Sequence, residues 1–242
     1  MAPATSRAKN LRKGGKTLTR IAFHQKLERL RDRLLEMAGL AVQTLRFAMD
    51  AQSLGELAAC SKVRSNEVAI NTAEREVDQM ALDLLAMEQP MAGDLRFILA
   101  AIKINSELER IGDQAMSIAL LAEEQAQGQP CALPVDIPHM AELSIAMLRT
   151  ALEALATSDA ELAASVLSMD DSVDDMNRRF KNILLQCIAE DSTAASPAVN
   201  LLFIARSLER IADHATNMAE DVIFWVRGAD VRHGWELGSQ AS

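Results

Sequence analysis

The sequence predicts an all-α fold made of two tandem antiparallel three-helix bundles, and three observations support this prediction. Residues 109–113 (Glu-Arg-Ile-Gly-Asp) return one hundred residues later as residues 209–213 (Glu-Arg-Ile-Ala-Asp), and a repeat at fixed period indicates copies of one unit. Apolar residues make up 49% of the chain, and Tyr is absent; this composition favours helix over strand. Six prolines and ten glycines are few for 242 residues.

Three helices are expected in the first half. The first runs from about Ile21 to Met49, where apolar residues recur at helical spacing. A capping-box pattern at residues 53–56 (Ser-Leu-Gly-Glu) opens the second, which reaches about Met87 and ends before Pro90, because a residue preceding proline avoids the α region. The third runs from about Gly93 to Ala126. The apolar stripe of the first helix comprises Leu27, Leu30, Leu34, Met37, Leu40 and Leu45.

The second half repeats this plan after a proline-punctuated linker. Its first helix covers about Pro138 to Ala156. A second capping-box pattern, residues 158–161 (Ser-Asp-Ala-Glu), opens a single helix that reaches about Ala189. The last helix follows a turn near Thr193 and stops at Gly228, since glycine commonly ends helices.

Short turns between successive helices make each half an antiparallel bundle. We expect the first bundle over residues 20–127 and the second over residues 137–228. A basic, flexible N-terminal arm (residues 1–19) precedes them, and a C-terminal tail (residues 229–242) follows.

The charge is unevenly distributed along the chain. Residues 1–27 hold seven Lys or Arg and no acid, whereas the remainder has a net charge of −16 within an overall −9. This negative charge of residues 28–242 disfavours nucleic-acid binding, which needs clustered cations. The basic segment is expected to be a disordered, solubilising tail. The alternative is contact with anionic lipid or an acidic partner, so membrane association is at most peripheral.

The cysteines indicate a reducing compartment. Cys60, Cys131 and Cys187 are odd in number and widely spaced, which argues against a disulfide framework. We find no secretory signal and no apolar stretch near the ~20 residues that a membrane span needs. A cytoplasmic location is expected.

Oxygen-bearing side chains form a stripe on the last helix. On a helical wheel, Glu209, Asp213, Asn217 and Glu220 lie beside the apolar stripe and therefore on the shoulder of the bundle. His214 points away from this acidic stripe and is expected at the surface, not as a ligand. The apolar stripe comprises Leu201, Ala205, Leu208, Ala212, Ala215 and Ala219.

A metal site needs ligands from a second helix at the same height. Counting back equally from the turn near Thr193, the acids nearest in height to Glu209 and Asp213 are Asp174 and Asp170. Both pairs are spaced one helical turn apart, so each presents two carboxylates on one face. The second half is therefore expected to hold four carboxylates together.

Counting from the turn near Pro90 gives the equivalent set in the first half. There Glu109 and Asp113 are level with Asn71 and Glu67 on the preceding helix. These four residues are the expected first site.

Residues 74–78 (Glu-Arg-Glu-Val-Asp) form another Glu-x-x-x-Asp motif. Asp78 would lie roughly 10 Å off in height at 1.5 Å per residue. Only Glu74 is therefore kept, as an extra ligand of the first site.

Clustered carboxylates repel one another, and a multivalent cation would remove that cost. An all-oxygen set suits Mg²⁺, Mn²⁺, Ca²⁺ or iron, and sometimes zinc. The alternative is a solvated acidic shoulder on which Arg110 and Arg210 make ordinary ion pairs. No ferritin-like Glu-x-x-His tetrad, phosphate-binding glycine loop or nucleophile elbow is present. The chain is therefore not expected to be an enzyme.

Three segments resemble the PhoU family of phosphate-specific transport accessory proteins. They are residues 90–96 (Pro-Met-Ala-Gly-Asp-Leu-Arg), 107–113 (Glu-Leu-Glu-Arg-Ile-Gly-Asp) and 205–220, and the resemblance extends over about residues 20–228. It implies tandem three-helix bundles, frequent homodimers and multinuclear metal clusters held by E(D)-x-x-x-D motifs. Iron, zinc, Mg²⁺ and Mn²⁺ are the candidate ions.

The resemblance also implies a non-enzymatic role. Such a protein restrains phosphate uptake and, with the ATPase subunit of a phosphate ABC transporter and a sensor histidine kinase, represses the phosphate-starvation response when phosphate is plentiful. The alternatives are a metal-storage or metal-dependent phosphohydrolase protein, and a metal-free helical scaffold.

The two expected metal sites differ in their ligands. Ser117 and Leu120 stand where the second half has Asn217 and Glu220, and Asn71 replaces one carboxylate of the first site. Affinity for a hard cation rises with ligand charge and number. We therefore expect the second site to load first.

Overall fold

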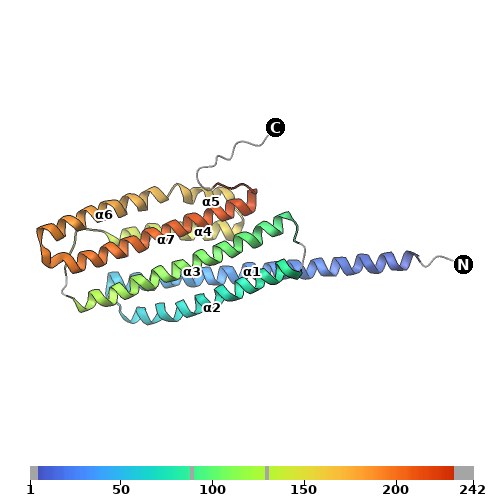
Figure 1. Cartoon of the computed structure of the whole chain (residues 1–242), viewed down its shortest axis with the longest axis horizontal. Coiled ribbons are helices and arrows are strands. Elements are labelled where there is room, and N and C mark those ends of the chain that lie inside the picture. Colours follow the sequence, from blue (N-terminus) through green and yellow to red (C-terminus); the bar gives the residue numbers. More distant parts are fainter. Residues whose placement is uncertain (1–4, 88–89, 129–130, 232–242) are drawn as a thin grey trace, which may run out of the picture.

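Two groups of long antiparallel helices lie side by side along the longest dimension of the molecule (Figure 1). The computed structural model describes residues 5–87, 90–128 and 131–231. Within these ranges every regular element is helical, which confirms the all-α prediction for the described part of the chain.

The helices fall in the two residue ranges expected for the bundles, with one exception. The first helix begins at Thr5, inside the expected N-terminal arm and well before Ile21. Residues 1–4 of that arm and 232–242 of the expected tail lie outside the described residues. The first bundle comprises α1 (Thr5–Leu54), α2 (Ala58–Met87) and α3 (Ala92–Gln127). The second comprises α4 (Ile137–Thr157), α5 (Ala160–Leu167), α6 (Asp170–Glu190), the short 3-10 turn η1 (Ser192–Ala194) and α7 (Ala195–Arg227).

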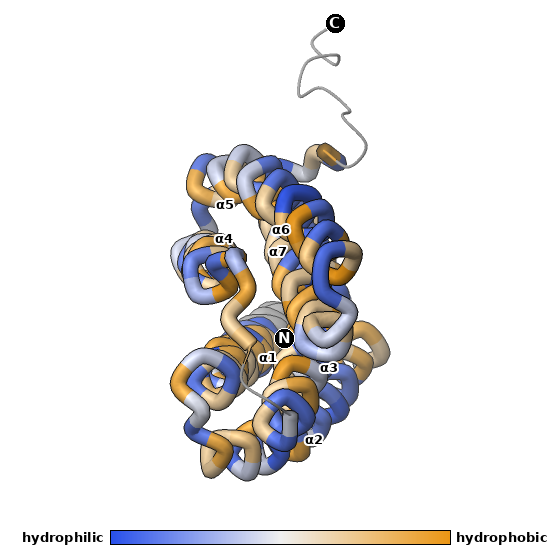
Figure 2. Tube along the Cα trace, turned by 90° about the vertical axis from the view of Figure 1, so that its left-hand side faces the viewer, coloured by the Kyte–Doolittle hydropathy of each residue, from blue (hydrophilic) through white to orange (hydrophobic). Residues whose placement is uncertain are grey.

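The bundles meet mainly through their last helices. Figure 2 shows them end-on, with α1–α3 in one group and α4–α7 in the other. Contacts between the groups join α3 to α7 and α1 to α4, and the α3–α7 contact is the most extensive between any two described helices. Both helices carry a copy of the repeated pentapeptide, so the bundle–bundle interface is built from the duplicated segments.

Helices α3 and α7 run antiparallel. Residues with higher numbers in α3 contact residues with lower numbers in α7. Continuing this trend, Ile111 of α3 lies level with Ile211 of α7. The halves are thus related by an approximate two-fold axis near these two buried isoleucines. The contacts that show the direction are Arg96 with Trp225, Lys103 with Asp221 and Glu107 with His214.

The apolar stripes form the core of each bundle. All six residues of the stripe expected on the last helix are buried. In the first helix, Leu30, Leu34, Met37 and Leu45 are fully buried, whereas Leu27 and Leu40 are half-buried against the core. No helix among the described residues combines the length and apolarity that a membrane span requires.

The capping box expected at the start of the second helix is wrong. Ser53 lies in the last turn of α1, and its hydroxyl donates to the Gln52 side chain at 2.7 Å. Gly55 follows with φ of 71°, the left-handed conformation that ends helices. The glycine inside the motif thus terminates one helix instead of capping the next.

The second capping box predicts the helix start to within a residue but names the wrong cap. Ser158 adopts φ of 56° and closes the C-terminus of α4. Asp159 is the cap of α5, since its carboxylate accepts from the main-chain N–H groups of Glu161 and Leu162 at 2.9 and 3.1 Å. A carboxylate is also favoured by the helix dipole at this end.

The long helix expected between these turns is interrupted. The hydroxyls of Ser165 and Ser168 donate to main-chain carbonyls three residues back, which offers the backbone an alternative to helical bonding. The N–H of Met169 then bonds the carbonyl of Val166 in a tightened turn. As a result Asp170 stands in the first turn of α6.

Candidate metal centre

Three carboxylates converge between α6 and α7. One oxygen each from Asp170, Asp174 and Asp213 lies within 4.8 Å of the other two. Asp170 and Asp174 are half-buried, whereas Asp213 is exposed on the shoulder of the bundle. The structure thus brings together three of the four carboxylates that sequence counting placed at one height.

Glu209 stands one turn before Asp213 and is only 9% exposed. Its Oε1 accepts from Arg206 at 2.5 Å, but its Oε2 is buried without a hydrogen-bond partner among the described residues. Asp170 Oδ1 is buried and unpartnered in the same way. Buried polar atoms are nearly always satisfied because leaving one unpaired is costly. We call Asp170, Asp174, Glu209 and Asp213 the second-half cluster.

Three acids of the second-half cluster, Asp170, Glu209 and Asp213, resist ionisation. Burial first, and then the charges of Asp174 and Asp213, raise the pKa of Asp170. Burial and Asp213 raise the pKa of Glu209. Partial desolvation and then Asp174 raise the pKa of Asp213. A bound cation would reverse these effects, because it favours the charged carboxylates.

The first half brings Glu67, Asn71, Glu74, Glu109 and Asp113 together, and we call them the first-half cluster. Burial, followed by the charges of Asp113 and Glu74, raises the pKa of Glu109. Burial and then Glu67 raise the pKa of Asp113. The Asn71 amide donates to Glu67 at 2.7 Å, which occupies one carboxylate oxygen. Among the described residues, only the second half offers a trio as compact as the one above.

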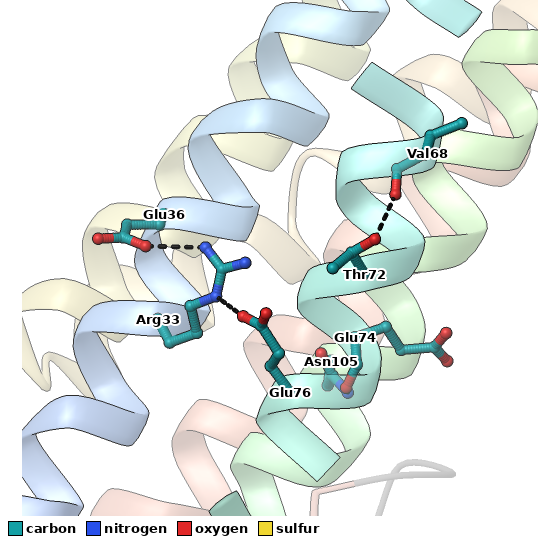
Figure 3. Close-up of polar contacts among 7 residues, drawn as sticks. All are labelled: Arg33, Glu36, Val68, Thr72, Glu74, Glu76 and Asn105. Atoms are coloured by element: carbon teal, nitrogen blue, oxygen red, sulfur yellow. Dashed lines mark hydrogen bonds and ion pairs between the residues drawn. The ribbon is translucent and has the colours of Figure 1, made fainter. Parts of the chain in front are cut away.

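Glu74 and Glu76 of α2 point in different directions (Figure 3). Glu76 pairs with Arg33 of α1 at 2.7 Å, whereas Glu74 extends on the opposite side of α2. Asn105 of α3 donates to the Glu74 carbonyl and to Asp78 Oδ1, each at 3.0 Å. Asp78 is thereby held one turn before Glu109, off the height of the first-half cluster.

The remaining expected ligands lie outside the compact trio. The Asn217 amide donates to Glu107 of α3 at 3.4 Å, so it faces the bundle interface. Glu220 is half-buried further along α7. That Asn217 and Glu220 are metal ligands therefore stays a prediction.

The expectation that His214 lies at the surface is wrong. Its side chain is buried, and its Nδ1 lies 2.6 Å from Glu107 Oε2. The helical wheel locates the side of α7 that faces the core of its own bundle. It does not record that another side of α7 packs against α3 of the first bundle. The side of α7 that carries His214 is therefore an interface with α3 and does not face solvent.

Glu107 is a structural residue that the sequence analysis did not single out. Burial alone would raise its pKa, but the hydrogen bond and charge of His214 outweigh burial and lower it. The signal available in the sequence is the difference between the repeats, because Glu107 corresponds to Ser207 and His214 to Gln114. At these two positions the difference between copies accompanies a contact that only one half makes.

The PhoU domain model matches residues 34–122 and 137–222, once in each bundle. The chain belongs to the PhoU domain family. The expected family resemblance is therefore confirmed, and it extends over both halves.

Proteins named as PhoU homologs are similar to this chain over most of their length. A phosphate-specific transport system accessory protein PhoU homolog of Pseudomonas aeruginosa is 39% identical over 215 residues, 87% of this chain and 88% of that protein. The homolog of Rhizobium meliloti is 36% identical over 209 residues, with 86% and 88% covered.

Two solved PhoU structures share the fold. The crystal structure of PhoU from Pseudomonas aeruginosa superposes with a TM-score of 0.83 at 37% identity, covering 86% of this chain and all of that one. The phosphate transport system regulatory protein PhoU from Streptococcus pneumoniae gives a TM-score of 0.77 at 25% identity, covering 86% and 99%.

Proposed function

We propose that this PhoU-family chain is a regulatory adaptor of phosphate homeostasis. It restrains phosphate uptake and represses the phosphate-starvation response, acting with the ATPase subunit of a phosphate ABC transporter and a phosphate-responsive sensor histidine kinase. The observation that carries the proposal is the family match over both bundles, together with relatives that are named as accessory and regulatory proteins of phosphate transport. The adaptor works without catalysis, in the cytoplasm and as a homodimer.

A multivalent cation bound to the second-half cluster is part of this proposal. The support is chemical: an all-oxygen donor set, raised carboxylate pKa values, and two buried oxygens, on Glu209 and Asp170, that lack partners in the described structure. The cation supplies positive charge beyond that of Arg206, which pairs with only one of the four carboxylates, Glu209. Iron, zinc, Mg²⁺ and Mn²⁺ all suit oxygen ligands.

The position of the cluster suggests what the cation does. Asp170 and Asp174 belong to α6, and Asp213 belongs to α7, so a shared cation ties these two helices together. An adjacent side of α7 packs on α3 through His214. A cation that fixes α6 to α7 therefore holds α6 to the helix through which the second bundle packs on the first. This gives the adaptor a stable surface for its partners.

A deletion strain tests the regulatory role. At high phosphate, loss of the gene should derepress alkaline phosphatase and raise phosphate uptake, and the wild-type gene should restore both. Complementation with Asp213→Ala should restore them less well than the matched variant Asp175→Ala, whose exposed carboxylate pairs with Arg178 and lies outside the cluster. Normal phosphate handling in a strain without any PhoU copy would contradict the proposal. Phosphoester turnover by the metal-loaded protein, abolished by Asp213→Ala, would favour a hydrolase instead.

A further inference from the structure

A groove of about 650 Å³ runs between α6 and α7 and ends at Asp174 and Glu209 of the second-half cluster. Its walls include apolar side chains that are unusually exposed: Phe203 at 58%, Leu185 at 49% and Val199 at 39%. Single exposed apolar residues are ordinary, but several that line one concave surface mark an interaction site. This groove has no role in the bundle core.

Three cations flank the apolar wall: Arg178, Lys181 and Arg206. They stand out on a chain with a net charge of −9. Arg206 pairs with Glu209 inside the cluster, and Arg178 pairs with exposed Asp175. Lys181 forms no ion pair with any residue that the structure describes. Of the three cations, Lys181 is therefore the one whose charge no described carboxylate balances.

The first bundle shares two of the three exposed apolar positions of this surface. Leu99 occupies the position of Val199 in the repeat, and Leu82 precedes its turn by as many residues as Leu185 precedes the second turn. Both are exposed, Leu82 at 57% and Leu99 at 40%. Lys103, however, stands at the position of Phe203, so the first bundle keeps only these two apolar positions.

The cations, in contrast, are largely absent from the first bundle. By the same alignment, Asp78 stands where the second half has Lys181, and Ser106 where it has Arg206. Only the second bundle therefore combines an exposed apolar wall with flanking cations.

We propose that the α6–α7 groove binds an amphipathic helix of a partner protein, one that carries acidic residues beside its apolar face. The exposed apolar wall would receive the apolar face, as in other helix-in-groove contacts. Lys181, which has no ion pair among the described residues, gives complementarity to an acid of the partner and disfavours a basic one. A second copy of this chain fits less well, because an isologous contact would bury the same patch of both subunits and so bring two copies of unpaired Lys181 into one interface.

The inference rests on the proposed adaptor role only in requiring that a protein partner exists. Its test is a selection from a displayed library of amphipathic helical peptides with randomised flanking positions. The full-length wild-type protein is the target, and Phe203→Glu is used for counter-selection. Failure of this selection would leave the deletion phenotype unaffected, and a normal deletion strain would leave peptide binding unaffected, so the two failures are distinguishable.

Selected peptides should show apolar residues at helical spacing with Asp or Glu beside them. In fluorescence anisotropy, Leu185→Glu, Phe203→Glu and Lys181→Glu should each weaken binding at least about tenfold, the loss expected at a central contact. The control variants lie in the first bundle: Leu99→Glu, at the position of Val199, and Arg75→Glu, which precedes its turn by as many residues as Arg178 precedes the second turn. Each should change binding less than about twofold. All these side chains are exposed, so circular dichroism melts should stay close to wild type.

Three results would overturn the inference. The first is a selection that enriches no peptide distinguishing wild type from Phe203→Glu. The second is enrichment of basic peptides. The third is a dimer in sedimentation experiments that Phe203→Glu and Leu185→Glu both dissociate, since this would assign the groove to a second copy of the chain.

Discussion

His214 Nδ1 lies 2.6 Å from Glu107 Oε2, which joins the last helix of the second bundle to the last helix of the first. Both side chains are largely removed from solvent. Asn217 donates to the same carboxylate oxygen, at 3.4 Å. The contact therefore fixes the two bundles against each other at a position next to Asp213 of the second-half cluster.

Glu107→Ala should destabilise the protein by about 1–3 kcal/mol, because it leaves His214 buried without its partner. Urea unfolding at neutral pH measures this as a lower midpoint. Glu142→Ala is the control: its carboxylate is mostly exposed and lies 4.0 Å from His139, so its effect should stay within about 0.5 kcal/mol. Equal effects of the two substitutions would show that the buried contact adds nothing.

The same contact should make stability depend on pH. The pKa of Glu107 is lowered from its ordinary value of 4.5 in the fold. Its stabilising contribution is therefore fully present above about pH 4.5 and is lost as the pH falls through the lowered pKa. The difference in unfolding free energy between wild type and Glu107→Gln should shrink over that acidic range. A difference that grows on acidification would contradict this sign.

The second-half cluster should have the opposite dependence in metal-free protein. The pKa values of Asp170, Glu209 and Asp213 are raised, so their charged forms destabilise the fold at neutral pH. The penalty is relieved as the pH falls through the raised values. Asp213→Asn should therefore raise the melting temperature of chelator-treated protein at pH 7, with the gain vanishing at lower pH. Added Mn²⁺ should stabilise wild type and have little effect on Asp213→Asn.

Metal loss should be unequal between the two clusters. Asp213→Ala should remove most of the bound metal with helix content nearly intact, because this exposed side chain leaves no core cavity. Asp113→Ala should remove much less, since the Asn71 amide already occupies Glu67. Elemental analysis of protein purified without chelator or nickel measures both, with Asp175→Ala as the control. Equal losses, or unfolding of either variant, would show that these carboxylates play other roles.

The repeats differ at Gly112, where the second copy has Ala212. A Cβ at Gly112 would lie 3.1 Å from Cδ1 of Ile70, a buried side chain. Gly112→Ala should change stability by less than about 1 kcal/mol, because the gain in helix propensity offsets the crowding. Gly112→Val should destabilise by about 1–3 kcal/mol through overpacking. Chemical denaturation compares the two variants, and a neutral valine would show that Ile70 moves freely.

Within one bundle, the sequence predicts the apolar stripes and the acids that lie at the same height. Helical spacing identifies the buried stripe of α7, and counting from the turn near Thr193 brings Asp170, Asp174 and Asp213 together. Turn geometry was less predictable, because Gly55 and Ser158 adopt left-handed conformations inside motifs that also read as helix starts.

The interruption before Asp170 and the burial of His214 were missed for different reasons. The first depends on serine hydroxyls that compete for main-chain carbonyls, a weak effect that leaves the apolar period unchanged. The second depends on the other bundle, whose position no pattern within a single helix records.

The approximate two-fold axis near Ile111 and Ile211 makes the chain comparable to a symmetric dimer whose subunits have been joined. In a true homodimer, each contact across the axis must occur twice. Here the residues equivalent to Glu107 and His214 are Ser207 and Gln114. The Glu107–His214 contact therefore occurs once, and the equivalent place on the other side of the axis has different side chains. Covalent linkage thus allows one molecule to keep a common framework while its two ends acquire different ion affinities and different partners.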